Sequence, residues 1–229
     1  MLTKNPPEDY QFGDDYSAFL ISAENIILVK HTEVFNRNEL KKDIPKDLRT
    51  FRYSPYISPK SNLCSQKHGI YGLLDEFNAY YQGNLMSYNL YLVYQQLAAD
   101  NPNIYQKYIQ NMSSDRLAFY EFKYFILAYL RRAKTEYPAI YRAFLDNAPL
   151  REAYKQIHNR YQELMNAHDT RLSELMETLN SQGIESYFED EYFYVENRGV
   201  GMNTGEILVL KTELLKPEYI SLHNEFLIN

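Results

Sequence analysis

Apolar residues recur at spacings of three and four along the middle of the chain, as they do in amphipathic α-helices. Glycines, prolines and short polar runs interrupt this pattern where helices would end. In the longest uninterrupted segment, an apolar seam runs from Leu150 to Leu179 with His168 as its one strongly polar member. The pattern predicts a helical body over residues 69–182, and the length of its last helix suggests that part of it projects or meets a partner.

Glycine, serine and proline positions divide this body into separate helices. Gly83 is expected to end the first helix, and the serine pair at 113–114 to begin a later one. Pro138 and Pro149 occupy positions typical of the first turn of a helix. With a last short helix that Pro217 begins, we expect a bundle of about six helices.

Runs of β-branched and aromatic residues near both chain ends are typical of β-strands. Residues 16–34 contain two such runs separated by Ser-Ala-Glu-Asn, which predicts a hairpin. Residues 184–197 and 206–215 flank a glycine-rich stretch and predict a second hairpin. We expect both hairpins to contribute to one small antiparallel sheet beside the helices.

These elements predict a single α+β domain over residues 1–229. No linker-like stretch divides the chain, although residues 1–15 form a polar leader for which disorder is one interpretation. Residues 184–229 supply the C-terminal hairpin and the last helix. The segment 117–130 is apolar on nearly every helical face, so we place it at the centre of the helical body.

Composition and charge exclude several classes of protein. The formal net charge is -6 and the basic residues do not cluster, which argues against nucleic-acid binding. No apolar run approaches the roughly 18 residues of a membrane span, so we expect a soluble protein. The start has no secretory signal, which makes the cytoplasm the default location and leaves an exported mature form open. The single cysteine, Cys64, excludes an internal disulfide.

Glu121 is a carboxylate inside the apolar central helix. Its neighbours three and four residues away include Leu117, Ala118, Tyr124 and Phe125. A desolvated carboxylate must find a donor or titrate at raised pH, which is how general acids and bases are made. Glu121 is therefore either a catalytic candidate or a core residue bonded to a tyrosine or lysine of another helix. We prefer the second interpretation, and we likewise expect His168 to be a hydrogen-bonded core residue.

Glu76 lies in the stretch LLDEFNAYY, between the small residues Gly72 and Ala79, which leave room beside its carboxylate. Asp75, in contrast, belongs to the polar flank of the same helix. Residues 69–83 resemble the glutamate-bearing helix of gluzincin-type zinc metallopeptidases, where an E-x-x-A pattern supplies a metal ligand. The resemblance covers about fifteen residues and implies that Glu76 would bind zinc.

The same family carries H-E-x-x-H on an earlier helix, and this sequence contains no such motif. The residues upstream that offer ligands for an altered site with Glu76 are His31, Glu33 and His68. His31 and Glu33 are two residues apart and would share one face of a strand. The resemblance therefore implies a metallopeptidase-like domain that has lost its usual zinc site or binds zinc through an altered set. The catalytic candidates are Glu76, from the resemblance, and Glu121, from its apolar surroundings.

A non-enzymatic function is the alternative. The chain has 23 tyrosines, no tryptophan and no complete set of catalytic groups. Tyrosine combines an apolar ring with a polar hydroxyl and is enriched where proteins bind peptides or other proteins. The second hypothesis is therefore a tyrosine-rich helical binding or scaffold module with a protein or peptide partner.

Overall fold

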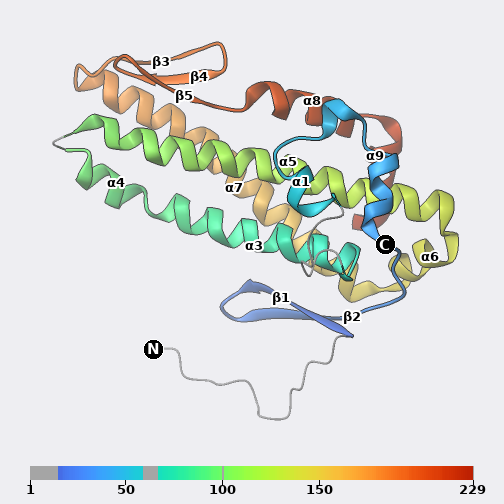
Figure 1. Ribbon diagram of the computed structural model, residues 1–229. Helices are drawn as coiled ribbons and strands as arrows, with labels where there is room; N and C mark the ends of the chain where they lie inside the picture. The colour runs from blue at the N-terminus through green and yellow to red at the C-terminus, as the bar shows by residue number, and fades with distance from the viewer. Residues whose placement is uncertain (1–14, 59–66, 100, 229) are drawn as a thin grey trace.

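The computed structural model describes residues 15–58, 67–99 and 101–228 (Figure 1). These residues form eight α-helices and two small antiparallel sheets, which confirms the predicted α+β class. None of the helices in the described ranges is long and apolar enough to cross a membrane.

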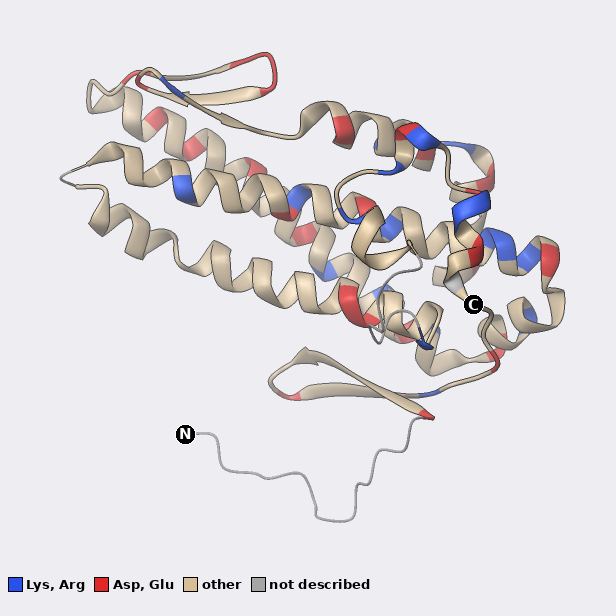
Figure 2. Ribbon diagram, in the orientation of Figure 1, with Lys and Arg blue, Asp and Glu red and all other residues tan. Residues whose placement is uncertain are grey.

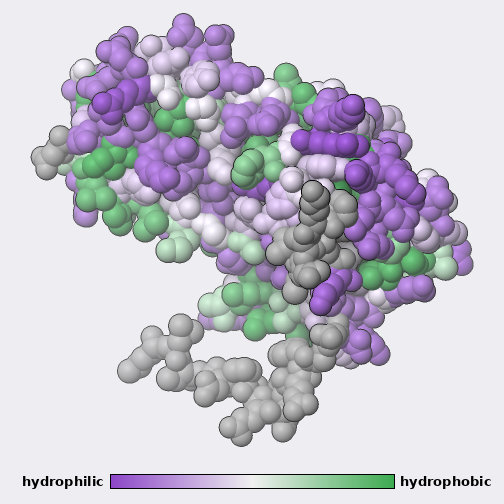
Figure 3. All heavy atoms as spheres, viewed as in Figure 1, coloured by the Kyte–Doolittle hydropathy of each residue, from purple (hydrophilic) through white to green (hydrophobic). Residues whose placement is uncertain are grey.

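The N-terminal hairpin was predicted correctly. It consists of β1 (Tyr16–Ser22) and β2 (Asn25–Lys30), and it packs against α3 and α7. One face buries Phe19 and Val29, while the opposite face exposes the apolar side chains that Figure 3 shows over this hairpin, namely Leu20, Ile26 and Leu28.

Helices make up most of the molecule. The α-helices are α1 (Tyr53–Tyr56), α3 (Ile70–Asn89), α4 (Tyr91–Leu97), α5 (Tyr105–Glu136), α6 (Pro138–Asp146), α7 (Ala148–Ser181), α8 (Thr204–Leu214) and α9 (Pro217–Ile228). Short 3-10 helices are η1 (Arg37–Lys42), η2 (Lys46–Leu48) and η3 (Pro102–Ile104). Helix α5 contacts α3, α4, α6, α7, α8 and α9, so the apolar segment 117–130 is at the centre as predicted.

Two predicted helix boundaries are wrong. Helix α3 continues through Gly83 to Asn89, and α5 begins at Tyr105 rather than at the serine pair. In both places apolar packing outweighs the local preference. Glycine inside a helix costs only about 1 kcal/mol, whereas Tyr105, Tyr108 and other residues before the serines are buried on one continuous face.

The predicted strand over 206–215 is also wrong, because this segment is α8. Its buried residues Ile207 and Leu210 are three apart and face α5, a helical spacing that its β-branched composition concealed. The C-terminal sheet instead comprises β3 (Ser186–Glu189), β4 (Tyr192–Val195) and β5 (Arg198–Gly201).

The two hairpin regions do not share one sheet, as the sequence had suggested. The described strands form a two-stranded sheet, β1-β2, and a three-stranded sheet, β3-β4-β5. Helix α7 has 34 residues and is about 50 Å long. It contacts β1 and β2, whereas β3 follows its C-terminal end, so the length of α7 keeps the sheets apart (Figure 1).

The interior has two apolar clusters. The larger one surrounds the second half of α5, and the smaller one lies where the first half of α5 meets the end of α7 and the C-terminal sheet. Leu175 and Leu179 of α7 pack there with Phe193 and Val195 of β4. The extra length of α7, which the sequence had suggested would project or meet a partner, is thus covered by the C-terminal sheet.

Helix α4 and the adjoining part of α3 have an unusual surface. Residues 77–99 contain no Asp, Glu, Lys or Arg, and Figure 2 shows this end of the molecule without charge on either helix. Leu92 and Leu97 of α4 are 66% and 57% exposed, so an uncharged and partly apolar surface faces outward here.

Candidate functional site

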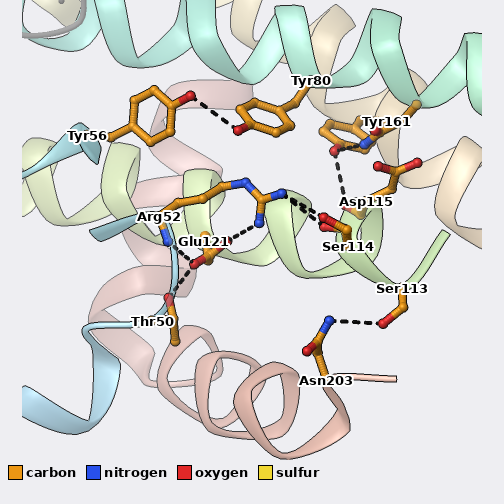
Figure 4. A network of polar contacts seen from close by, with 11 residues as sticks. Thr50, Arg52, Tyr56, Tyr80, Ser113, Ser114, Asp115, Glu121, Tyr161 and Asn203 are labelled. Carbon is orange, nitrogen blue, oxygen red and sulfur yellow. Dashed lines mark hydrogen bonds and ion pairs between the residues drawn. The ribbon is translucent and has the colours of Figure 1, made fainter. Parts of the chain in front are cut away.

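A buried ion pair joins the N-terminal segment to the central helix (Figure 4). Glu121 is fully buried, and its Oε2 accepts a hydrogen bond of 2.7 Å from Nη1 of Arg52. Its Oε1 accepts hydrogen bonds from the hydroxyl of Thr50 at 2.6 Å and from the backbone N–H of Arg52 at 2.8 Å. The prediction that Glu121 bonds to a tyrosine or lysine of another helix is therefore wrong. An arginine that precedes α1 neutralises this carboxylate instead.

Arg52 reaches beyond Glu121. Its Nη2 donates to the carbonyl and the hydroxyl of Ser114, at 3.3 and 3.1 Å, and its guanidinium lies 4.6 Å from the ring centre of Tyr80 on α3. The Nε of Arg52 has no hydrogen-bond partner within the described part of the chain. One side chain therefore links the segment before α1 to α5 and α3.

Asp115 lies six residues before Glu121 on α5 and is 8% exposed. Its Oδ2 has no hydrogen-bond partner among the described residues. Burial raises the pKa of Asp115 to about 7, and the positive charge of Arg52 opposes that rise. The carboxyl group lines a shallow depression of about 410 Å³ that small residues of α3, Ala79 and Gly83, leave open.

A cleft of about 770 Å³ lies on the other side of Arg52. It separates the first half of α5 from β5 and the start of α8. Polar side chains of α5 form one wall, among them Gln106, Gln110 and Ser113, and Gly199 and Gly201 of β5 form the opposite wall. The side-chain amide of Asn203, just before α8, donates to the hydroxyl of Ser113 at 2.9 Å and closes one end (Figure 4).

Strand β5 presents an open backbone edge to this cleft. Its one neighbour in the described sheet is β4, with Arg198 opposite Val195 and Val200 opposite Phe193. In a hairpin with a two-residue loop, the pair next to the loop exchanges hydrogen bonds, and bonded pairs alternate from there. The N–H and C=O groups of Gly199 and Gly201 therefore point away from β4. No hydrogen bond to them occurs within the described ranges.

The predicted metal ligands are brought together only in part. The rings of His31 and His68 lie 5.2 Å apart, His31 stacks on Tyr71, and its Nε2 is 2.8 Å from the hydroxyl of Ser17. Glu33 is exposed. Over the ranges that the structure describes, no group of three or more His, Cys, Asp and Glu side chains is arranged to hold a metal ion. Cys64 lies outside those ranges.

Glu76 is half-buried on α3, near the hydroxyls of Tyr56 and Tyr80, which are 3.2 Å apart. Burial raises the pKa of Tyr56, with further contributions from the Tyr80 hydrogen bond and from the charge of Glu76. Asp75 is exposed, as expected for the polar flank of the helix. The structure thus places Glu76 beside a tyrosine pair.

His168 is fully buried, as its place in the apolar seam of α7 predicted. The predicted hydrogen bond of its ring does not occur among the described residues. Neither of its ring nitrogens has a partner within the described part of the protein, and the ring stacks on Tyr88 at 5.2 Å. Burial lowers the pKa of His168 to about 4. It packs as a neutral aromatic ring.

The sequence missed Arg52, Asp115 and the β5 edge. Arg52 lies in an ordinary polar stretch, and no local pattern connects it with Glu121, which is 69 residues away. The sequence pattern did not single out Asp115, because a helix start was predicted at the two serines that precede it. The Gly-Val-Gly sequence at 199–201 suggested a loop, although alternate glycines in an edge strand also leave the backbone accessible.

No protein-family model matches this chain, and neither the curated proteins nor the solved structures include a significant match. The resemblance to gluzincin-type metallopeptidases therefore stays a prediction, and functional inference depends on the geometry of the site itself.

Replacing Glu121 should show how much the fold depends on the ion pair. Glu121→Gln keeps the shape of the side chain but leaves the buried guanidinium of Arg52 without a counter-charge. We expect a loss of about 3–5 kcal/mol in the free energy of unfolding, measured by urea denaturation. Glu177→Gln, at an exposed position of α7, is the matched control and should change the value by less than about 0.5 kcal/mol.

The double variant R52M/E121Q should lose less stability than the sum of its single variants, because no unpaired charge remains. A Glu121→Gln variant as stable as the control would contradict the structural role of the pair.

Asp115 should make stability depend on pH. Its pKa is higher in the folded protein than the usual 3.8, so the folded state holds the proton more tightly than the unfolded chain. The wild type should therefore lose stability as the pH rises from about 4 to 7. Asp115→Asn lacks this titration, so its stability relative to wild type should increase over that range by up to about 4 kcal/mol. Parallel curves of unfolding free energy against pH for the two proteins would contradict the assignment.

Proposed function

We propose that this protein is a non-enzymatic peptide-binding module, in which an extended segment of a partner adds a strand to β5. The observation that carries the proposal is the open backbone edge at Gly199 and Gly201, which borders a cleft of about 770 Å³. Strand addition of this kind gains its affinity from backbone hydrogen bonds and its specificity from contacts to alternate side chains.

The surroundings of β5 suit such a ligand. Glycine has no side chain to obstruct an approaching backbone. The rings of Tyr192 and Tyr194 lie over these glycines, within 4 Å of where a side chain would begin, and Tyr194 stacks on Tyr187 at 4.9 Å. A strand added to β5 would place alternate side chains against this tyrosine surface, which gives a use for part of the unusual tyrosine content.

The wall of the cleft that α5 forms favours a partner peptide that is polar and weakly charged. Gln106, Gln110 and Ser113 offer both donors and acceptors. The charge of Arg52 is already neutralised by Glu121. The other charged residues that line the cleft, Lys107 and Glu206, bring one charge of each sign, so the lining has no large net charge. Because β5 has four residues, a peptide of about four residues would pair along its full length.

Gly201→Pro tests the proposal, because proline removes the outward N–H while β4 pairing does not use that group. Peptides would first be selected on the wild-type protein from a random phage-displayed library, and their Kd measured by calorimetry. We expect Gly201→Pro to weaken binding at least tenfold, or about 1.4 kcal/mol. Gly201→Ala keeps the N–H, and its added carbon would lie 3.8 Å from Tyr192, an ordinary contact, so its Kd should stay close to wild type.

Amide NMR spectra locate the bound peptide independently. Titration should shift the resonances of Gly199 and Gly201 more than those of β1 and β2. A library that yields no binder, or a binder that Gly201→Pro retains with wild-type affinity, would contradict the proposal.

The metallopeptidase-like hypothesis keeps one supporting observation, the contact between His31 and His68. It predicts that purified protein retains one zinc per chain by elemental mass spectrometry and that a chelator lowers its melting temperature. His68→Ala would remove both effects, whereas His158→Ala, on α7, would leave them unchanged. Protein without zinc and with an unchanged melting temperature in chelator would reject this hypothesis.

A further inference from the structure

A separate cavity of about 320 Å³ lies where α8 and α9 pack on α5. Its walls are mainly apolar. Aliphatic side chains come from Leu127 of α5, Leu214 and Leu215 at the end of α8, and Ile220 of α9, and the rings of Tyr120 and Tyr219 complete the apolar part of the lining. Leu215 is 71% exposed at its rim, so the cavity opens to solvent beside an apolar surface.

Lys123 of α5 reaches this cavity without a charged partner. Its ammonium group makes no ion pair or hydrogen bond in the described part of the chain, and the aromatic ring near it, that of Phe119, is 5.8 Å away. Burial lowers the pKa of Lys123 to about 8, so the group still carries its charge at neutral pH. Lys123 is partly buried, and a partly desolvated cation without a partner is destabilising, so a bound anion would offset that cost.

A second cation lies at the same cavity. Lys211 of α8 holds its ammonium group 5.0 Å from the ring centre of Tyr120. No acidic side chain is found among the residues that line the cavity over the described ranges. The cavity therefore combines two positive groups with aliphatic and tyrosine side chains.

The third basic side chain that lines the cavity, His223, does not supply charge. The Nδ1 of His223 is 2.8 Å from the hydroxyl of Tyr154, and burial lowers the pKa of His223 to about 4. The ring of His158 lies 4.6 Å from it, and burial lowers the pKa of His158 to about 3. Both imidazoles are neutral near pH 7, so the positive charge comes from the lysines.

We propose that this cavity binds an aliphatic carboxylate, with its carboxylate between Lys123 and Lys211 and its hydrocarbon chain against the leucines. At about 30 Å³ for each non-hydrogen atom, the volume accommodates about ten such atoms, the size of octanoate. The residues that line this cavity are all different from those that line the β5 cleft, and the proposal does not depend on the peptide-binding proposal.

Calorimetry with octanoate and octan-1-ol on the full chain tests the site. We expect octanoate to bind with a Kd of about 1 mM or lower, and at least tenfold more tightly than the alcohol, which has the same chain but no charge. Lys123→Met keeps the length and apolar volume of the side chain and should weaken octanoate binding at least tenfold. Lys155→Met, at an exposed position of α7, is the matched control and should leave the Kd unchanged.

Lys211→Glu provides a second variant at the edge of the cavity, outside the tightly packed centre, should Lys123→Met fail to fold. It reverses one charge and should abolish octanoate binding while leaving the binding of octan-1-ol intact. Equal affinities for acid and alcohol, an unchanged Kd in Lys123→Met or Lys211→Glu, or no saturable binding of octanoate would overturn the proposal.

Discussion

The ion pair between Arg52 and Glu121 is the interaction on which the arrangement around the central helix depends. A carboxylate in the middle of α5, surrounded by apolar residues, has to be neutralised, because an unpaired buried charge would cost several kcal/mol. Arg52 meets that requirement only if the segment before α1 lies across α5. The same guanidinium also donates to Ser114 and lies over the ring of Tyr80, so the group that neutralises the carboxylate contacts α3 as well.

The polar residues of α5 lie where the neighbouring elements do not fully cover the surface of this helix. Most of the helix is covered by apolar side chains from six other helices, but three regions of its surface differ. Asp115 faces a depression beside α3, Gln106 and Ser113 face the cleft below β5, and Lys123 faces the cavity under α8 and α9. A central helix with an entirely apolar surface would have left nothing for a ligand to recognise. The proposed peptide and carboxylate sites both depend on these interruptions.

Periodicity predicted those elements whose burial follows one regular face. The seam of α7, the apolar centre of α5 and the β1–β2 hairpin all fall in this class, because their alternation or three-four spacing is visible without knowledge of the partner element. The ends of the helices were less predictable than the elements themselves. Gly83 and Ser113 carry local preferences for a helix end, yet both lie inside helices, because contacts made by neighbouring residues across the interior are worth more than those preferences.

The sequence by itself determined the fold class, the helical body and the unusual position of Glu121, since each follows from the polarity of residues close together in the chain. The tertiary structure alone decided which groups meet. It chose Arg52 as the partner of Glu121 and placed His31 beside His68, although the described residues gather no full set of metal ligands. It also turned residues 199–201 into an exposed strand edge over a cleft. Pairings between residues tens of positions apart depend on how whole helices pack. Local periodicity contains no information about that packing.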